Sequence, residues 1–95
     1  MRIKWLDLAV DDLEGVNADD ISQDNPNAAS RVVSRLWTAV QSLAEQPKMG
    51  RPGRVYGTRE LVVSDTPCVV PFRVVGSEIE ILRVLHGARD WPKSF

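Results

Sequence analysis

The second half of the chain is divided by turn-forming residues into short segments typical of β-strands. Ser64 to Pro67 and Gly76-Ser77 separate three such segments, which run from Arg59 to Val63, from Cys68 to Val75 and from Glu78 to His86. All three are rich in valine, isoleucine and other residues that suit a pleated, half-buried surface. A two-residue Gly-Ser connection suits a tight hairpin. The pattern therefore predicts three consecutive antiparallel strands.

The first half shows helical periodicity instead. Apolar residues recur at spacings of three and four from Val10 to Ile21, after Asp7, which can cap a helix. A second helix is predicted to begin at Pro26 and to stop before Pro47, because proline suits the first helical position and disfavours helix before it. Its apolar stripe comprises Ala29, Val32, Val33, Leu36, Val40 and Leu43. With so short a joint, the two helices are expected to form an antiparallel hairpin.

A short alternating segment from Arg2 to Trp5 predicts a first strand, which makes the element order βααβββ. We therefore expect an α+β fold: an N-terminal strand, a two-helix antiparallel hairpin packed on a small, mostly antiparallel sheet, and a short basic tail. With 95 residues, the chain predicts a single domain over residues 1–95. No apolar run approaches a membrane span and the N-terminus lacks a signal peptide pattern, so a cytoplasmic protein is expected.

The register of the predicted hairpin assigns side chains to the two faces of the sheet. With Val75 opposite Glu78, Arg73 lies opposite Glu80 as an ion pair and Val70 lies opposite Arg83. The face expected to pack on the helices carries Leu61, Val63, Cys68, Val70, Phe72, Val74, Ile79, Ile81 and Leu85. The more exposed face would carry Glu60, Val62, Val69, Arg73, Val75, Glu78, Glu80, Leu82, Val84 and His86. Pro71 cannot donate to a ladder, so an edge position or a bulge is expected there, and a bulge would shift the register by one.

Charge is unevenly distributed along the chain. Residues 1–46 contain four Lys/Arg and eight Asp/Glu, a balance of −4, whereas residues 47–95 contain eight and five, a balance of +3. A basic coat for general nucleic-acid binding is therefore absent, and an anionic partner would bind the second half. The glycine- and proline-rich segment from Pro47 to Gly57 is predicted to be a loop, and its Arg51 and Arg54 make it a candidate contact surface.

Several other side chains have ordinary structural interpretations. Cys68, the only cysteine, lies in an apolar run and is expected to be a buried thiol. Trp5 and Trp37 are expected in the core, and Trp91 is either a lid on the sheet or an exposed anchor. The acidic residues of the first helix, including Asp12, are expected on a solvated face. One histidine, one cysteine and scattered carboxylates give no ligand spacing, so we expect no metal site and no cofactor.

Four segments, in this order and spacing, resemble the RelE/ParE superfamily of bacterial toxins over nearly the whole chain. They are Asn25-Pro26 before Ala28-Ala29, then Gly50-Arg51-Pro52-Gly53-Arg54, then Gly57 to Val63, then Ile81 to Arg89. The resemblance implies a growth-arresting toxin of a type II toxin–antitoxin system, held in a hetero-oligomer with a cognate antitoxin. RelE-like members cut mRNA on the ribosome, whereas ParE-like members poison DNA gyrase and cleave nothing themselves.

The two targets imply different roles for the same residues. In a nuclease, His86 would be the acid or base, Arg59 and Arg89 would stabilise the phosphate, with Arg83 able to assist, and Glu60 could serve as a base. In a gyrase poison, we expect target or antitoxin contacts from Arg51, Arg54, Arg83 and Trp91. Arg59 and Arg83 could instead pair with the acidic first helix, and His86 could be a structural residue at the end of a strand.

The sequence favours the gyrase poison. In the predicted register, Arg59 and Arg83 point to the packed face while His86 points to the other, and Glu60 is about four residues along the strand from His86. RelE-like nucleases are strongly basic, whereas this chain has a net charge of −1. Ribosome-dependent mRNA cleavage remains the alternative, and a detoxified module that only binds its antitoxin remains a second one.

Overall fold

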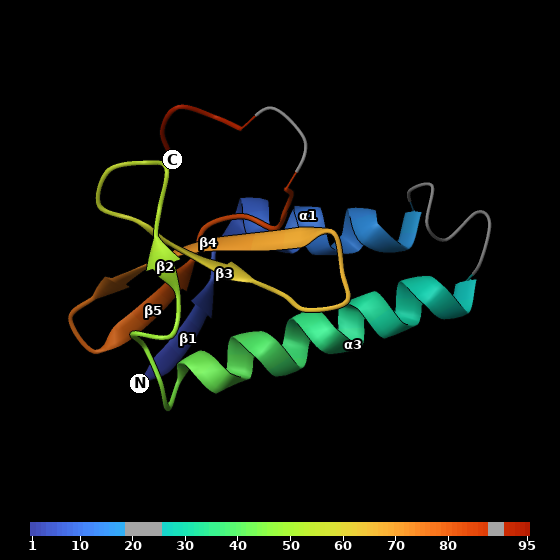
Figure 1. The fold of residues 1–95 in the computed structure, drawn as a ribbon, viewed down its shortest axis with the longest axis horizontal. Helices are drawn as coiled ribbons and strands as arrows, with labels where there is room; N and C mark the ends of the chain where they lie inside the picture. Colours follow the sequence, from blue (N-terminus) through green and yellow to red (C-terminus); the bar gives the residue numbers. More distant parts are fainter. Residues whose placement is uncertain (19–25, 88–90) are drawn as a thin grey trace.

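The computed structural model describes residues 1–18, 26–87 and 91–95. Two antiparallel helices lie side by side along a twisted sheet (Figure 1). The helices are α1 (Asp7–Ala18) and α3 (Pro26–Leu43). The strands are β1 (Arg2–Trp5), β2 (Arg51–Pro52), β3 (Arg59–Val62), β4 (Cys68–Val75), β5 (Glu78–Ile81) and β6 (Leu85–His86). The predicted α+β fold is confirmed, while Ile21, the expected end of the first apolar stripe, lies outside the described residues.

The strands follow the order β1-β5-β4-β3-β2, and β6 also pairs with β4. β1 runs parallel to β5, and the other pairs are antiparallel. The mostly antiparallel sheet is therefore confirmed. Within the predicted loop, Arg51–Pro52 forms the two-residue strand β2 on the edge of β3, an element that the sequence pattern did not indicate.

The hydrophobic core lies between α3 and the sheet. Leu36, Val40 and Leu43 of α3 are fully buried, as their spacing predicted. In α1, Ala9 is fully buried and Val10 is exposed, so the expected stripe of α1 is wrong at Val10. On the sheet, the core comprises Leu61, Val63, Cys68, Val70, Phe72, Ile79, Ile81 and Val84. Neither α1 nor α3, the helices of the described part of the chain, is long and apolar enough to cross a membrane.

The two tryptophans expected in the core have different environments. Trp5 is partly buried against the core, as predicted. The Trp37 side chain is 53% exposed on α3, so the prediction for Trp37 is wrong. Their rings stack with centroids 6.1 Å apart and an interplanar angle of 7°. Trp37 therefore covers Trp5 from the solvent side instead of being covered itself.

The last predicted strand is interrupted opposite Pro71. The β4–β5 register is confirmed from Val75↔Glu78 to Phe72↔Ile81, but Cys68 then pairs with His86, one residue later than a continuous ladder requires. The Leu82 N–H still donates to the Pro71 carbonyl at 3.0 Å. Proline has no N–H to return the second bond of that pair, so the ladder breaks there. The expected bulge is therefore present, although Pro71 lies in the central strand and not at an edge.

This one-residue shift changes the assignment of residues to faces. The expected pairing of Val70 with Arg83 is wrong, and Val84 joins the core on the helix side instead of the exposed face. The opposite face is also less exposed than predicted, because Glu60, Val69 and Leu82 are buried. A shift of one residue turns every later side chain to the other face, which is why the sequence register failed only after Ile81.

Cys68 is buried at the start of β4, as predicted. Burial raises the pKa of its thiol, partly offset by the side-chain hydrogen bond with Thr66. The unfolded thiol therefore loses its proton at a lower pH than the folded one, so the folded state binds more protons above about pH 8.5. The free energy of unfolding is expected to fall there as the pH rises. Urea unfolding of the wild type and of Cys68→Ala between pH 7 and 9.5 measures this, and parallel curves for the two proteins would contradict it.

Candidate functional site

The segment Arg51–Thr58, which we name the basic loop, is organised around the buried carboxylate of Glu60. Glu60 lies in β3 directly opposite Arg51 of β2, and its side chain is 1% exposed. Oε1 accepts hydrogen bonds from Nε and Nη2 of Arg51 at 3.2 and 3.0 Å. Oε2 accepts a hydrogen bond from the Arg54 backbone N–H at 2.7 Å, and the Arg54 Nε lies 3.7 Å from it. Both carboxylate oxygens are thus occupied by residues of the loop.

Short-range hydrogen bonds close the basic loop on itself. The Gly53 N–H donates to the Thr58 carbonyl at 2.9 Å, and the Thr58 N–H and hydroxyl donate to the Val55 carbonyl at 3.1 and 2.6 Å. A Cβ on residue 53 would stand 2.2 Å from the Thr58 Oγ1, so only glycine fits there. Gly57 has a φ of 79°, which a residue with a side chain adopts at a cost. The segment predicted to be a loop is therefore a closed turn after the short strand β2.

The C-terminal tail lies against the same loop. The Arg54 guanidinium carbon lies 3.9 Å from the centre of the Trp91 ring, a cation–π contact. The Trp91 indole N–H donates to the His86 carbonyl at 3.3 Å. Figure 1 shows the C-terminal segment ending beside the loop that precedes β3. The structure thus brings Arg54, His86 and Trp91 together, three of the residues that the sequence singled out.

Two other predicted site arginines are bound within the fold. The Nη2 of Arg59 donates to the backbone carbonyls of Lys48 and Gly50, so its expected pairing with the acidic helix is wrong. Arg83 does pair with that helix: its Nε and Nη2 contact the two carboxylate oxygens of Asp12 at 2.6 and 3.0 Å. The hydrogen bond that Arg83 donates to Asp12 raises the pKa of Arg83, and burial has a smaller, opposite effect. These contacts fix both arginines from within the fold, and the expectation that Asp12 is solvated is wrong.

The candidate acid and base groups for RNA cleavage are separated. Glu60 lies opposite Pro71 on β4, and His86 lies opposite Cys68, three residues further along that strand. Three residues correspond to about 10 Å and, because three is odd, to opposite faces of the sheet. The sequence predicted that Glu60 and His86 are about four residues apart along the strand. The bulge shortens this separation to three residues. Arg89, the remaining candidate, lies outside the described residues.

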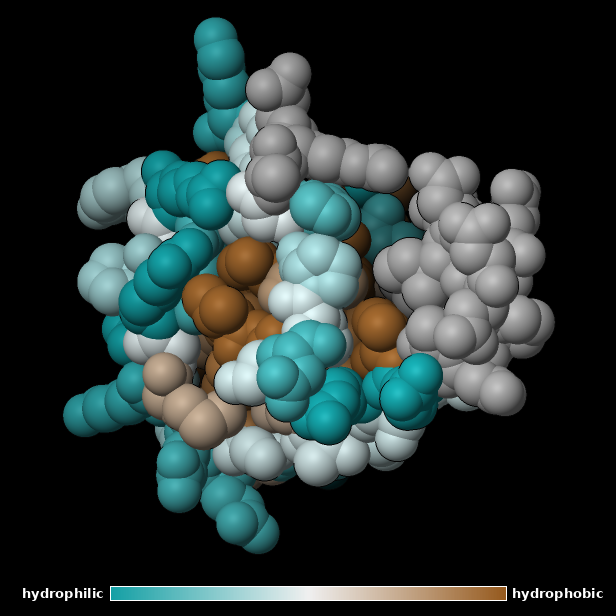
Figure 2. Space-filling view, turned by 45° about the vertical axis from the view of Figure 1, so that its right-hand side comes forward, coloured by the Kyte–Doolittle hydropathy of each residue, from teal (hydrophilic) through white to brown (hydrophobic). Residues whose placement is uncertain are grey.

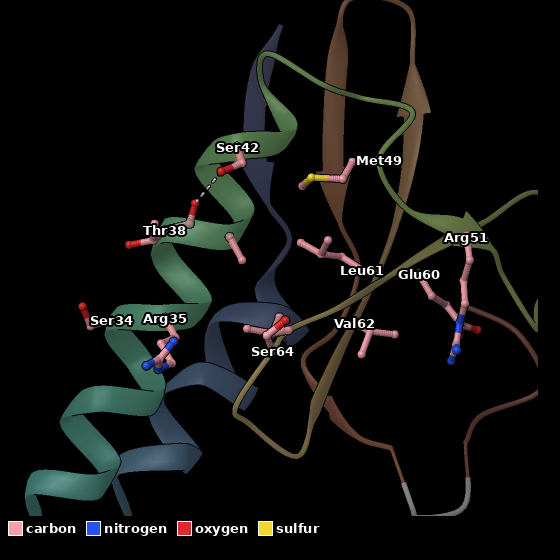
Figure 3. A pocket seen from close by; sticks show the side chains of 12 residues that line it. Ser34, Arg35, Thr38, Ser42, Met49, Arg51, Glu60, Leu61, Val62 and Ser64 are labelled. Carbon is pink, nitrogen blue, oxygen red and sulfur yellow. Dashed lines mark hydrogen bonds and ion pairs between the residues drawn. The ribbon is translucent and has the colours of Figure 1, made fainter.

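A groove of about 650 Å³ runs between α3 and the strands β2 and β3 (Figure 3). Leu61 and Met49 point into it from the sheet side, and Thr38 and Ser42 belong to its lining on the helix side. Its lining comprises Ser34, Arg35, Thr38, Ala39, Ser42, Met49, Arg51, Glu60, Leu61, Val62, Val63 and Ser64. Figure 2 shows one face of the molecule on which hydrophobic side chains gather in the centre with hydrophilic ones around them. The groove thus combines apolar and hydroxyl groups between a helix and the edge of the sheet.

A protein-family model described as the ParE toxin of the type II toxin–antitoxin system parDE matches residues 3–91. The chain belongs to this toxin family. The resemblance of the four sequence segments to RelE/ParE toxins is therefore confirmed.

Individual relatives agree with this assignment. The chain is 47% identical over 92 residues to the candidate toxin Y4kP of Sinorhizobium fredii, covering 97% of this chain and 94% of that protein. It is 40% identical over 88 residues to toxin RelE2 of Caulobacter vibrioides, covering 93% and 97%. The solved chromosomal ParDE system of P. aeruginosa matches with a TM-score of 0.78 and 34% identity over 88% of this chain and 92% of that one. The RelBE2 complex of Mycobacterium tuberculosis, at 19% identity and a TM-score of 0.64 over 90% and 95%, shares the fold.

Two features of the ParE-family toxin site were missed in the sequence. Glu60 was considered only as a base, whereas it is the buried centre of the basic loop. One signal was present: Glu60 is the only acidic residue between Pro47 and Ser64, within reach of four cations on the same segment. Tyr56, which is fully exposed at the loop tip, carried no periodic signal that could single it out.

Proposed function

We propose that this ParE-family toxin arrests growth by poisoning DNA gyrase and does not cleave RNA itself. The observation that carries the proposal is the burial of Glu60 under Arg51 and Arg54, with both of its oxygens occupied. A general base must reach the proton that it removes. In this arrangement Glu60 cannot accept one without losing its arginine partners, and His86 lies on the opposite face.

The arginines support the same proposal. Arg59 and Arg83 donate to groups of the fold, Arg59 to backbone carbonyls and Arg83 to Asp12, so they are held away from a shared phosphate site. The predicted site residues that remain to contact a target are Arg51 and Arg54 on the loop and Trp91 on the tail. We propose Arg89 as a further contact. This arrangement suits binding to a large partner more than acid–base catalysis.

A cognate antitoxin is the second partner that we propose, and the groove between α3 and β3 is its site. The solved P. aeruginosa relative is a ParDE toxin–antitoxin system, which supports a hetero-oligomer here. The groove is partly apolar and bordered by the two-residue edge strand β2, so it suits an amphipathic helix combined with an added strand. A complex of this kind buries more than about 1,600 Å² in total. Because gyrase is the proposed target, we propose that the toxin acts in the cytoplasm.

The proposal is tested by inducing the toxin in growing cells, with mRNA ends and plasmid topology examined in the same samples. We expect intact messages and gyrase-linked DNA breaks, both suppressed when the antitoxin is coexpressed. His86→Ala should retain gyrase trapping, while Arg54→Ala should lose most of it.

The same experiment identifies the alternatives. Codon-phased cuts in translated messages that disappear with His86→Ala would overturn the proposal in favour of an mRNA nuclease, a possibility to which the name of the Caulobacter relative points. Normal growth without the antitoxin, at a confirmed level of folded protein, would indicate a detoxified antitoxin-binding module.

A further inference from the structure

The basic loop presents an aromatic side chain on a cationic surface. Tyr56 lies at its tip and is fully exposed to solvent. Arg51 and Arg54 of the loop and Lys48 just before it are exposed, whereas Glu60, the nearest acidic residue in the sequence, is 1% exposed. The accessible charge between Pro47 and Ser64, the stretch that carries Tyr56, is therefore entirely positive.

The loop is also ordered before any partner binds. Glu60 fixes Arg51 and the backbone of Arg54, and the Gly53–Thr58 and Thr58–Val55 hydrogen bonds close the turn that carries Tyr56. Arg51 and Arg54 nevertheless remain 53% and 47% exposed. Their guanidinium groups thus stay accessible to an anion while their positions are set, which lowers the entropy lost on binding.

We propose that the basic loop binds a nucleic-acid strand, with Tyr56 stacked on an unpaired base and Arg51 and Arg54 on the flanking phosphates. Aromatic stacking combined with a cationic surface is the usual way in which proteins hold single strands without reading sequence. In a protein–protein interface, such an aromatic is usually surrounded by contacts that exclude water from it. Tyr56 instead has the half-buried Val55 and the exposed Gly57 as its neighbours in the chain and is itself fully exposed.

This inference rests on the proposed function, since gyrase holds DNA opened at the site where a poison acts. It names the partner of the loop within that complex: the DNA and not the gyrase subunits. The charge on the loop is modest, so the interaction with DNA alone should be weak and strongly dependent on salt.

The test is fluorescence anisotropy of a labelled single-stranded 20-mer with the purified toxin, without gyrase, at 50 and 200 mM salt. We expect measurable binding at the lower salt. Tyr56→Ala should weaken it about tenfold or more, whereas Tyr56→Phe, which keeps the ring, should bind within about twofold of the wild type. Arg51→Gln should weaken binding and reduce its dependence on salt. Trp37→Ala, which removes an exposed aromatic from α3, is the matched control and should bind as the wild type does.

No binding by the wild type at 50 mM salt, or equal binding by Tyr56→Ala, would overturn the inference. Because gyrase is absent, either result leaves gyrase poisoning standing, whereas DNA binding without trapped gyrase in cells would refute the proposed function alone. A photo-crosslinking residue placed at position 56 gives a second measurement in the toxin–gyrase–DNA mixture. An adduct with DNA supports the inference, and an adduct only with a gyrase subunit contradicts it.

Discussion

Replacing Phe72 with alanine is expected to lower the free energy of unfolding by about 3–5 kcal/mol. Phe72 is fully buried in the central strand β4, between Arg59 of β3 and Ile81 of β5. Its ring also fills the space beside Gly50, where a Cβ would lie only 2.7 Å from the ring. A domain of this length has a total stability of about 5–14 kcal/mol, so the loss is a large fraction of it. Urea denaturation followed by circular dichroism measures the change.

Val74→Ala is the matched control on the same strand. Val74 is two residues from Phe72 and therefore on the same face, but its side chain is 44% exposed near the end of the sheet. Its truncation should cost less than about 1 kcal/mol. Equal losses for the two variants would mean that the core does not lie where α3 meets the middle of β4.

Asp12→Ala is expected to lower the free energy of unfolding by about 2–4 kcal/mol, somewhat less than the loss of one partner from a fully buried pair. Asp12 and Arg83 are 18% and 25% exposed, and Asp12 also accepts a hydrogen bond from the Val84 backbone N–H at 3.0 Å. Removing the carboxylate leaves both donors without that acceptor. The hydrogen bond with Asp12 raises the pKa of Arg83, so the stabilisation linked to the Arg83 proton is fully present at neutral pH and is lost as the pH rises through that pKa in strong alkali. The measurement is again urea denaturation, here at pH 7.

Arg73→Ala provides the comparison for this ion pair. Arg73 and Glu80 have the same 2.6 Å Nε–oxygen distance as Arg83 and Asp12, but Arg73 is 43% exposed. Its loss should cost at most about 1 kcal/mol, because exposed pairs contribute little. Similar losses in the free energy of unfolding for Asp12→Ala and Arg73→Ala would show that burial does not distinguish the two ion pairs.

The role of Arg83 can be separated from its stability effect. The double variant Asp12→Asn with Arg83→Gln keeps a hydrogen-bonded pair without charges. If Arg83 is structural, this variant should remain toxic at matched levels of folded protein. Loss of toxicity from a folded, stable double variant would restore Arg83 as a contact or catalytic residue.

The accuracy of the sequence predictions depended on how local each feature is. The hairpin register was correct from Val75 to Phe72, because a two-residue turn and alternating side chains specify it within a dozen residues. It failed past Pro71, where the missing N–H allows a bulge but the sequence does not say whether one forms. Trp37 was expected in the core, but it stacks on Trp5 from the exposed side of α3, a contact between distant residues that the sequence did not predict.

By itself, the sequence determined the main elements apart from the edge strand β2, their order, the α+β class and the toxin family, since periodicity, turn residues and motif spacing can all be read along the chain. The local register predicted the Arg73–Glu80 pair, but only the tertiary structure decided which charges from distant segments meet. Arg83 and Asp12 are 71 residues apart in the chain, and the Arg83 side chain and the Val84 N–H reach Asp12 because the fold places this segment beside α1. In the same way, Glu60 becomes the organiser of the basic loop only when β2 pairs with β3 and excludes water from its carboxylate. Burial and the approach of distant segments set these contacts, and neither is visible in local pattern.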